Sequence, residues 1–167
     1  MFNLQDSGNR WINGVHAHAS AMDIRNCVGE MVFSEYFTFS FVRNPYDLQV
    51  SLYHYIKSSK GHRDYEIANR LSFKEFLKRE IENNAPCQTD FLTDTDGNLI
   101  IDYIGKTENI EQSLKYITNR LDIPFRKVPH LNKSLRSRNP MTYYDDETKE
   151  LCWSYFKRDF KILGYEK

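Results

Sequence analysis

An arginine and a serine lie at a spacing that suits the binding of an anion. Arg43 directly precedes Asn44 and Pro45, and Ser51 follows eight residues after Arg43. Because Asn is a favourable N-cap and Pro suits the first helical turn, we expect a helix to begin here. The N–H groups of that turn lack partners within the helix, and the planar guanidinium matches phosphate oxygens. This pattern predicts an anion site; the alternative is that Arg43 only pairs with Asp47 and that Ser51 is a surface hydroxyl.

A second basic segment lies at residues 126–138, with the sequence RKVPHLNKSLRSR. It holds five Lys or Arg residues, one His and no acidic residue. Pro129 and several small polar residues indicate a loop rather than a helix. Such a loop either binds an anion or is a solvated surface, and its composition alone favours neither interpretation.

The elements that must position Arg43 are predicted to be a strand and a helix. Residues 36–42 (YFTFSFV) alternate Phe with small hydroxyl residues, which is typical of a strand. The helix should follow over residues 45–57. A turn signal, TDGN at 95–98, precedes a second predicted strand at 99–104. Strands that alternate with helices indicate an α/β fold.

Four further helices are predicted from capping residues and apolar periodicity. A helix over residues 20–28 has Ser20 as its cap, and another begins at Ser72. Asp145 or Asp146 is expected to cap the last long helix. The apolar faces expected of the last three helices are Phe73, Phe76, Leu77 and Ile81; Ile110, Leu114, Ile117 and Leu121; and Leu151, Tyr155 and Phe160.

The composition indicates one globular domain, residues 1–167, and excludes several classes of protein. With 40% hydrophobic and 14% aromatic residues, the chain is able to bury a core. Its 23 Lys and Arg balance its 23 Asp and Glu, so a generally basic nucleic-acid binder is excluded. No apolar run is long enough for a transmembrane helix, and the N-terminus does not resemble a signal peptide.

The spacing of cysteine and histidine residues predicts neither a disulfide framework nor a metal site. Cys27, Cys87 and Cys152 are odd in number and far apart, and no CxxC pair occurs. They are interpreted as three reduced thiols in a cytoplasmic protein. His16 and His18 are spaced to bind a metal together, but no third and fourth ligand follows at a usable spacing. We therefore expect no metal.

The run FSFVRNPYDLQVS resembles the 3′-phosphate-binding segment of sulfotransferases that use 3′-phosphoadenosine 5′-phosphosulfate (PAPS). The likeness is to the carbohydrate sulfotransferase branch and its bacterial relatives. In that family the Arg of the RNP triplet and the Ser eight residues later hold the 3′-phosphate, and the corresponding residues are Arg43 and Ser51. Four other segments resemble the family in the same order: HAHASAMDIRN, QTDFLTDTDGNLIIDYIGKTENI, HLNKSLRS and YYDDETKELCWSYFKRDFKILGY.

This resemblance implies a fold, a reaction and a set of binding residues. The fold would be a single P-loop-like α/β domain, with a mostly parallel sheet flanked by helices. The reaction would transfer a sulfuryl group from PAPS to a hydroxylated acceptor, a carbohydrate. Lys106 matches the family's strand that ends in Gly-Arg/Lys-x-Glu, and Asn132, Lys133 and Ser134 match the loop that closes over the nucleotide. These four residues would complete the PAPS site.

The resemblance also suggests a catalytic base. Sulfuryl transfer needs a base that takes the acceptor's proton, and histidine titrates near neutral pH. The family's register places His18 at a histidine that acts as the base in some branches. His16 is the second candidate, and its side chain shares a face with His18 if the segment is extended. The alternative for His18 is a hydrogen bond to the core. Glu108 is a further candidate, although pairing with Lys106 or ordering of its loop is the stronger expectation.

The sequence departs from the family in two places. The family reads Asp-Arg-Leu where this chain has Asp47, Leu48 and Gln49, so one positive charge near the site is missing. Nothing before His16 matches the family's N-terminal strand and Lys-x-Gly-Gly-Thr-Ser-type loop, which wraps the 5′-phosphosulfate and stabilises the transferring group. We therefore expect an N-terminal truncation, a misplaced start codon or a decaying gene, and little activity. The alternative function is a non-catalytic nucleotide-binding remnant or partner subunit of the same fold.

Overall fold

Two compact units, interleaved along the sequence, make up the chain. The computed structural model describes residues 11–12, 15–16, 18–127, 137 and 139–167. Unit 1 consists of Met1–Phe41 and Cys87–Ile104, and unit 2 consists of Val42–Pro86 and Gly105–Lys167. The expectation of a single domain stays a prediction.

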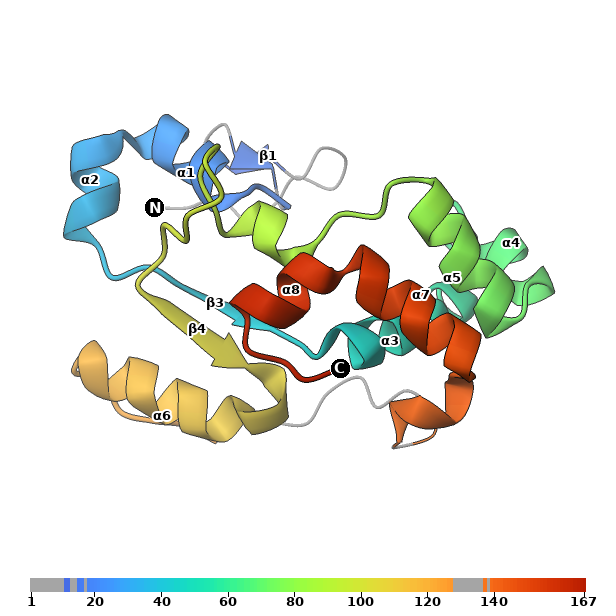
Figure 1. Ribbon diagram of the computed structural model, residues 1–167. Helices are drawn as coiled ribbons and strands as arrows, with labels where there is room; N and C mark the ends of the chain where they lie inside the picture. Colours follow the sequence, from blue (N-terminus) through green and yellow to red (C-terminus); the bar gives the residue numbers. More distant parts are fainter. Residues whose placement is uncertain (1–10, 13–14, 17, 128–136, 138) are drawn as a thin grey trace. The chain divides into compact units, whose positions relative to one another are not determined.

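Strands β3 (Phe39–Val42) and β4 (Tyr103–Lys106) form a two-stranded parallel sheet (Figure 1). The division between the units falls within both strands. Where the pair begins, the Asp102 carboxylate accepts hydrogen bonds from N and Oγ1 of Thr38 at 2.7 and 2.8 Å. With helices on either side in the sequence, this sheet confirms the α/β class.

The predicted strand at 99–104 is wrong in its bounds. Leu99 makes only an isolated antiparallel bridge to Thr93, across the turn at 95–98. Gly97 has φ +85° in this turn, a left-handed conformation that favours glycine. The strand itself, β4, begins only at Tyr103. There N of Tyr103 donates to the carbonyl of Thr38, next to the start of β3.

In unit 1 the predicted first helix is confirmed. Helix α1 (Ala21–Val28) begins after Ser20, whose hydroxyl accepts from N of Asp23 at 3.1 Å while the Asp23 carboxylate accepts from N of Ser20 at 2.8 Å. This reciprocal pair is a capping box. Gly29, with φ +87°, then separates α1 from α2 (Glu30–Glu35). The unit also contains the antiparallel pair β1 (Trp11–Ile12) and β2 (Val15–His16), and the 3₁₀ helix η1 (Gln88–Phe91).

Unit 2 is built around α3 (Pro45–Ser58), which confirms the helix predicted at 45–57. Its core-facing side chains repeat at helical spacing and include Tyr46, Val50 and Tyr53. Against it pack α4 (Tyr65–Arg70) and α5 (Phe73–Glu82). Ser72 caps α5 in a capping box, as expected, and Phe73, Phe76 and Leu77 are buried.

The last predicted helix is divided into two. Asp145 caps α7 (Asp146–Tyr155), Phe156 is the residue between the two helices, and α8 (Lys157–Ile162) follows. The expected apolar face is wrong for two of its three residues, because Leu151 and Tyr155 are only half-buried. The buried face runs instead through Cys152, Phe156 and Phe160, at steps of four residues. The helical period was right, but the face was displaced by one position.

Helix α6 (Ile110–Arg120) follows the 3₁₀ helix η2 (Thr107–Asn109), directly after β4. Its predicted apolar face is only partly buried. Ile117 is 3% exposed, whereas Ile110 and Leu121 are 37% and 42% exposed. The remaining 3₁₀ helix is η3 (Pro140–Tyr143).

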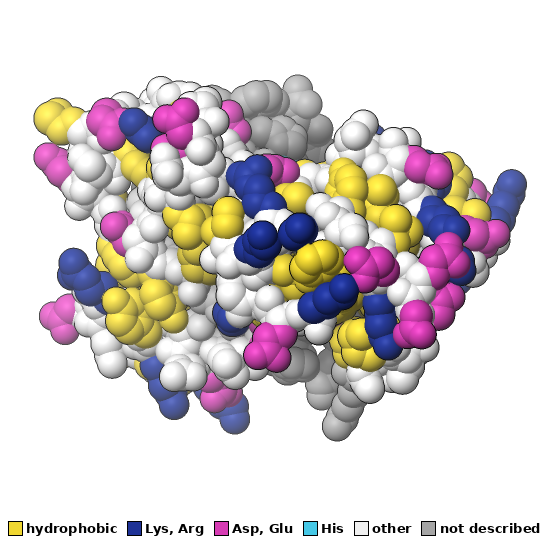
Figure 2. All heavy atoms as spheres, in the orientation of Figure 1, with side chains coloured by type: hydrophobic (Ala, Val, Ile, Leu, Met, Phe, Trp, Pro, Cys, Tyr) yellow, Lys and Arg dark blue, Asp and Glu magenta, His cyan; other side chains and the backbone are white. Residues whose placement is uncertain are grey.

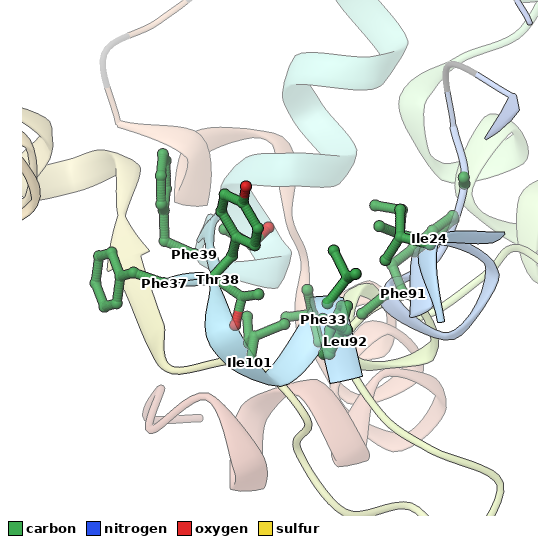
Figure 3. A pocket seen from close by; sticks show the side chains of 14 residues that line it. Ile24, Phe33, Phe37, Thr38, Phe39, Phe91, Leu92 and Ile101 are labelled. Carbon is green, nitrogen blue, oxygen red and sulfur yellow. The ribbon is translucent and has the colours of Figure 1, made fainter. Parts of the chain in front are cut away.

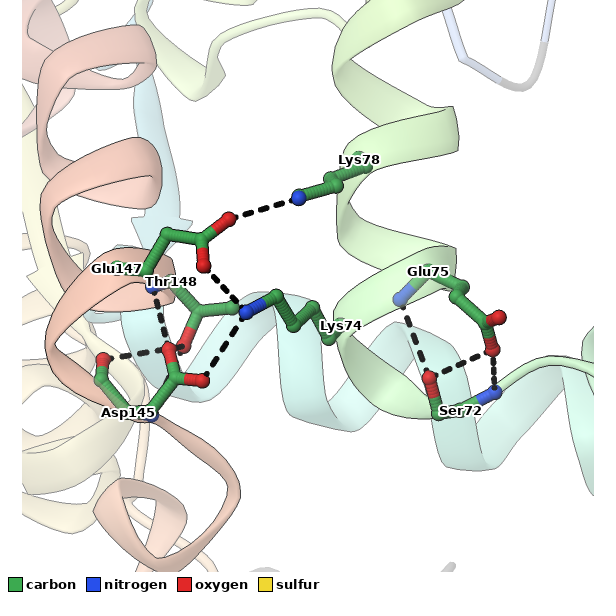
Figure 4. Close-up of polar contacts among 7 residues, drawn as sticks. All are labelled: Ser72, Lys74, Glu75, Lys78, Asp145, Glu147 and Thr148. Atoms are coloured by element: carbon green, nitrogen blue, oxygen red, sulfur yellow. Dashed lines mark hydrogen bonds and ion pairs between the residues drawn. The ribbon is translucent and has the colours of Figure 1, made fainter.

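Charged side chains join α5 to α7 within unit 2 (Figure 4). Nζ of Lys74 lies 3.3 Å from the Asp145 carboxylate and 2.5 Å from that of Glu147, and Lys78 lies 2.7 Å from Glu147. Figure 2 shows basic and acidic side chains beside one another on the face that carries α7. Exposed pairs of this kind contribute little to stability individually.

Candidate anion-binding site

Arg43 occupies the junction between β3 and α3 in unit 2. The strand ends at Val42, and Asn44 caps the helix, because its Oδ1 accepts from N of Tyr46 at 2.9 Å. Pro45 stands at the first helical position, where no N–H is needed. The local sequence therefore holds Arg43 at the positive end of a helix of fourteen residues.

The guanidinium of Arg43 contacts both residues that the sequence associates with it. Its Nη1 donates to Oγ of Ser51 at 2.7 Å, and its Nε lies 2.5 Å from Oδ2 of Asp47. The Arg43–Asp47 pair offered as an alternative is thus present, but Ser51 is bound by the same guanidinium. Because 32% of the Arg43 side chain is exposed, the group remains accessible to a ligand.

Glu108 connects this junction to the end of the chain. Its Oε1 accepts from N of Asn44 at 2.6 Å, and its Oε2 accepts from the Tyr165 hydroxyl at 3.1 Å. The expected pair with Lys106 is therefore wrong. Nζ of Lys106 instead donates to the carbonyl of Gly164 at 2.8 Å and lies 4.2 Å from the centre of the Tyr165 ring. Tyr165 ends the last segment that resembles the family, but no local pattern predicts its contact with Glu108, which lies 57 positions away in the sequence.

The two histidines belong to unit 1, whereas Arg43, Ser51 and Lys106 belong to unit 2. Strand β2 ends at His16, and His18 is an exposed residue in a turn before α1. The extended segment expected to align the two therefore does not continue to His18. Asn132, Lys133 and Ser134 lie outside the described residues.

Unit 1 contains an apolar cavity of about 700 Å³ (Figure 3). Phe33 from α2, Phe37 and Phe39 around the start of β3, and Phe91 from η1 line it. Ala19, which directly follows His18 in the sequence, also lines this cavity. The hydroxyls of Tyr36, Thr38 and Ser40 are the polar side-chain groups among its lining residues. The cavity is therefore suited to apolar rather than charged groups.

Within the described part of the chain, no group of three or more His, Cys, Asp or Glu residues is arranged to hold a metal ion. Among the same residues, no helix is both long and apolar enough to cross a membrane.

Comparison with known proteins relates the whole chain to one family. The model of the sulfotransferase family matches residues 3–166. An uncharacterized protein of Archaeoglobus fulgidus is 35% identical over 104 residues, which cover 60% of this chain and 80% of that relative. No solved structure matches the chain. With the family match extending over nearly all of its residues, and Arg43 and Ser51 in contact at the start of α3, the chain belongs to the sulfotransferase family.

Proposed function

We propose that this chain binds PAPS and transfers its sulfuryl group to a hydroxyl of a carbohydrate, on a P-loop-like α/β fold. The observation that carries the proposal is the contact of Arg43 with Ser51 at the N-terminus of α3, in a chain of the sulfotransferase family. In the proposed complex these two residues hold the 3′-phosphate of the nucleotide.

The hydrogen-bonding capacity of the two side chains suits a phosphate. The Ser51 hydroxyl accepts from Nη1 of Arg43, so its own proton is able to donate to a phosphate oxygen. The guanidinium is planar and carries five N–H donors, a geometry that matches phosphate oxygens, and 32% of the Arg43 side chain is exposed. Hydrogen bonds between charged groups are about twice as strong as neutral ones, which favours a doubly charged phosphate at this position.

The remaining binding and catalytic assignments rest on the family resemblance. Lys106, with Asn132, Lys133 and Ser134 of the basic loop, would complete the site. In the reaction, the acceptor oxygen forms a bond to sulfur while the bond from sulfur to the 5′-phosphate oxygen breaks. The acceptor proton passes to His18, or to His16 as the second candidate, and the products are a sulfate ester and adenosine 3′,5′-bisphosphate.

A second candidate function is nucleotide binding without catalysis. It is favoured by one feature of the sequence: none of the seven glycines lies in a Gly-rich loop with Lys and Ser or Thr. Such a loop would stabilise charge on the leaving phosphate, whereas Arg43 and Ser51 would grip a phosphate that does not react.

Calorimetry tests the proposed phosphate site. Adenosine 3′,5′-bisphosphate is expected to bind more tightly than adenosine 5′-monophosphate, because the 3′-phosphate contacts Arg43. Arg43→Ala should remove this preference by deleting a charged hydrogen bond of about 1.5–3 kcal/mol. Arg63→Ala is the matched control, since Arg63 lies in the same unit with a side chain 91% exposed. Equal affinities for both nucleotides, or an unchanged preference in Arg43→Ala, would contradict the proposal.

A transfer assay with labelled PAPS separates the two candidate functions. Turnover with a glycan acceptor that falls by about a hundredfold or more in His18→Ala supports catalysis with His18 as the base. A phenolic acceptor belongs in the panel, because the cavity that Ala19, the residue after His18, lines is also lined by aromatic side chains. Binding of the bisphosphate without transfer to any acceptor would support the non-catalytic function.

A further inference from the structure

The cap of helix α3 differs from the caps of three other helices in the chain. In α1, α5 and α7, the third residue of the helix reaches back and accepts a hydrogen bond from the backbone N–H of the capping residue; these third residues are Asp23, Glu75 and Thr148. In α3 the equivalent residue is Asp47. Asp47 pairs with Nε of Arg43 at 2.5 Å.

Glu108 supplies the missing acceptor of this cap. Its Oε1 accepts from N of Asn44 at 2.6 Å, although Glu108 is 64 residues distant in sequence. Because a carboxylate from another segment satisfies the Asn44 amide, the Asp47 carboxylate is available to Arg43. That pair orients the guanidinium whose Nη1 reaches Ser51.

Tyr165, near the end of the chain, holds the second oxygen of Glu108. Its hydroxyl donates to Oε2 at 3.1 Å. Burial raises the pKa of Tyr165, and the neighbouring Glu108 raises it further, so the hydroxyl remains a donor. The positive charge of Arg43 acts in the opposite direction on the pKa of Tyr165.

The polypeptide after α8 is held in place for this contact. Gly164 has φ +64°, a conformation that favours glycine, and N of Tyr165 donates to the carbonyl of Phe160 at 2.9 Å. Lys106 donates to the Gly164 carbonyl and lies over the Tyr165 ring. The backbone contacts of Gly164 and Tyr165, together with Lys106 over the ring, thereby position the Tyr165 hydroxyl beside Glu108.

We infer that Tyr165 and Glu108 are positioning residues for the anion site: they hold the Asn44 amide, which leaves Asp47 to orient Arg43 toward Ser51 and the ligand. The inference rests on the proposed function, since its ligand is the 3′-phosphate. Neither residue is required to contact the nucleotide.

The test uses Tyr165→Phe, which deletes the hydroxyl but keeps the ring over Lys106. Affinity for adenosine 3′,5′-bisphosphate is expected to fall about 3- to 10-fold, with the affinity for adenosine 5′-monophosphate unchanged. Tyr155→Phe is the matched control: it deletes a hydroxyl that donates to the carbonyl of Ala85 at 3.0 Å in the same unit. This control should leave both affinities unchanged.

Two further measurements distinguish positioning from a general structural role. In an Arg43→Ala background, Tyr165→Phe should have no further effect on bisphosphate affinity, because the residue acts through Arg43. In the nucleotide-free protein, the amide proton resonance of Asn44 should move upfield in Glu108→Gln, which replaces the charged acceptor by a neutral one. An unchanged Asn44 resonance would overturn the inference.

The outcomes separate this inference from the proposed function. If the wild-type chain does not prefer the bisphosphate, or Arg43→Ala changes nothing, the proposed function fails whatever Tyr165 does. If that preference holds but Tyr165→Phe leaves it intact, or lowers affinity equally with and without Arg43, the positioning role is wrong and the phosphate site stands.

Discussion

At the scale of single residues, the departure from the family motif at positions 48 and 49 has a physical consequence. Gln49 stands where the family has Leu, and only 3% of it is exposed. Its side-chain oxygen is buried, and no hydrogen-bond partner for it occurs among the described residues. Leu48, where the family has Arg, is half-buried. The substitution therefore affects the core of unit 2 as well as the charge near Arg43.

Gln49→Leu is expected to stabilise the chain. The replacement removes a buried carbonyl without a partner and keeps a side chain of similar size, which should raise Tm by about 2–4 °C if it contributes about 1 kcal/mol. Thermal unfolding followed by circular dichroism measures the change. Gln112→Leu makes the same substitution at an exposed position of α6 and should have little effect. A lower Tm for Gln49→Leu would show that the amide has a stabilising partner.

At the scale of elements, the starts of α1, α5 and α7 depend on caps formed within four residues. The cap of α7 is the best defined: Oδ1 of Asp145 accepts from N of Thr148 at 2.7 Å. The hydrogen bonds from the Thr148 backbone and hydroxyl, with the nearby Lys74, lower the pKa of Asp145 to about 2. The ionised cap therefore stabilises the folded chain more than the protonated one.

The sign of this shift predicts a pH dependence. Because the folded pKa of Asp145 lies below its unfolded value of 3.8, the stabilisation is fully present above that value and is lost as the pH falls through about 2. Asp145→Asn keeps a capping oxygen without the charge. The Tm of Asp145→Asn should lie below that of the wild type at about pH 6, and this difference in Tm should disappear as the pH falls toward about 2. Asp146→Asn, at the adjacent exposed position, is the control. A difference in Tm that stays constant over this range would contradict the role of the Asp145 charge.

At the scale of the whole molecule, the two units bury different amounts of apolar surface. Among the described residues, the fully buried apolar side chains of unit 1 are Ala21 and Leu92, whereas the remainder, including Val50, Phe76 and Phe156, belong to unit 2. Helices α1 and α2 instead carry partly exposed apolar side chains beside the cavity (Figure 3). A small buried core provides little resistance to local opening.

Native-state hydrogen exchange is expected to show this difference. Amides of α1 and α2 should exchange at least about tenfold faster than those of α3 and α7, because fewer buried contacts oppose their opening. Exchange measured by mass spectrometry on the full chain provides the comparison, with α6 as an internal reference of intermediate burial. Equal protection in both units would show that apolar surface on α1 and α2 is covered in solution.

Much of the local structure was determined by the sequence alone. Ser20, Ser72 and Asp145 cap helices as expected, because a cap depends on residues three positions apart. The contact of Arg43 with Ser51 was also predictable, because Arg43 directly follows the strand and Ser51 lies about two turns into the helix that begins at Pro45. The sequence was less informative about burial: the predicted apolar face of α6 is only partly buried and that of α7 was displaced by one position. Periodicity locates a face but not the neighbour that covers it.

The tertiary structure decided the contacts that complete the site. Glu108 reaches Asn44 across 64 residues, and Tyr165 reaches Glu108 across 57. Neither contact has a local signature, because it depends on where β4 and the polypeptide after α8 arrive in space. The sequence thus determined which groups begin the proposed anion site, while folding decided which distant groups contact them.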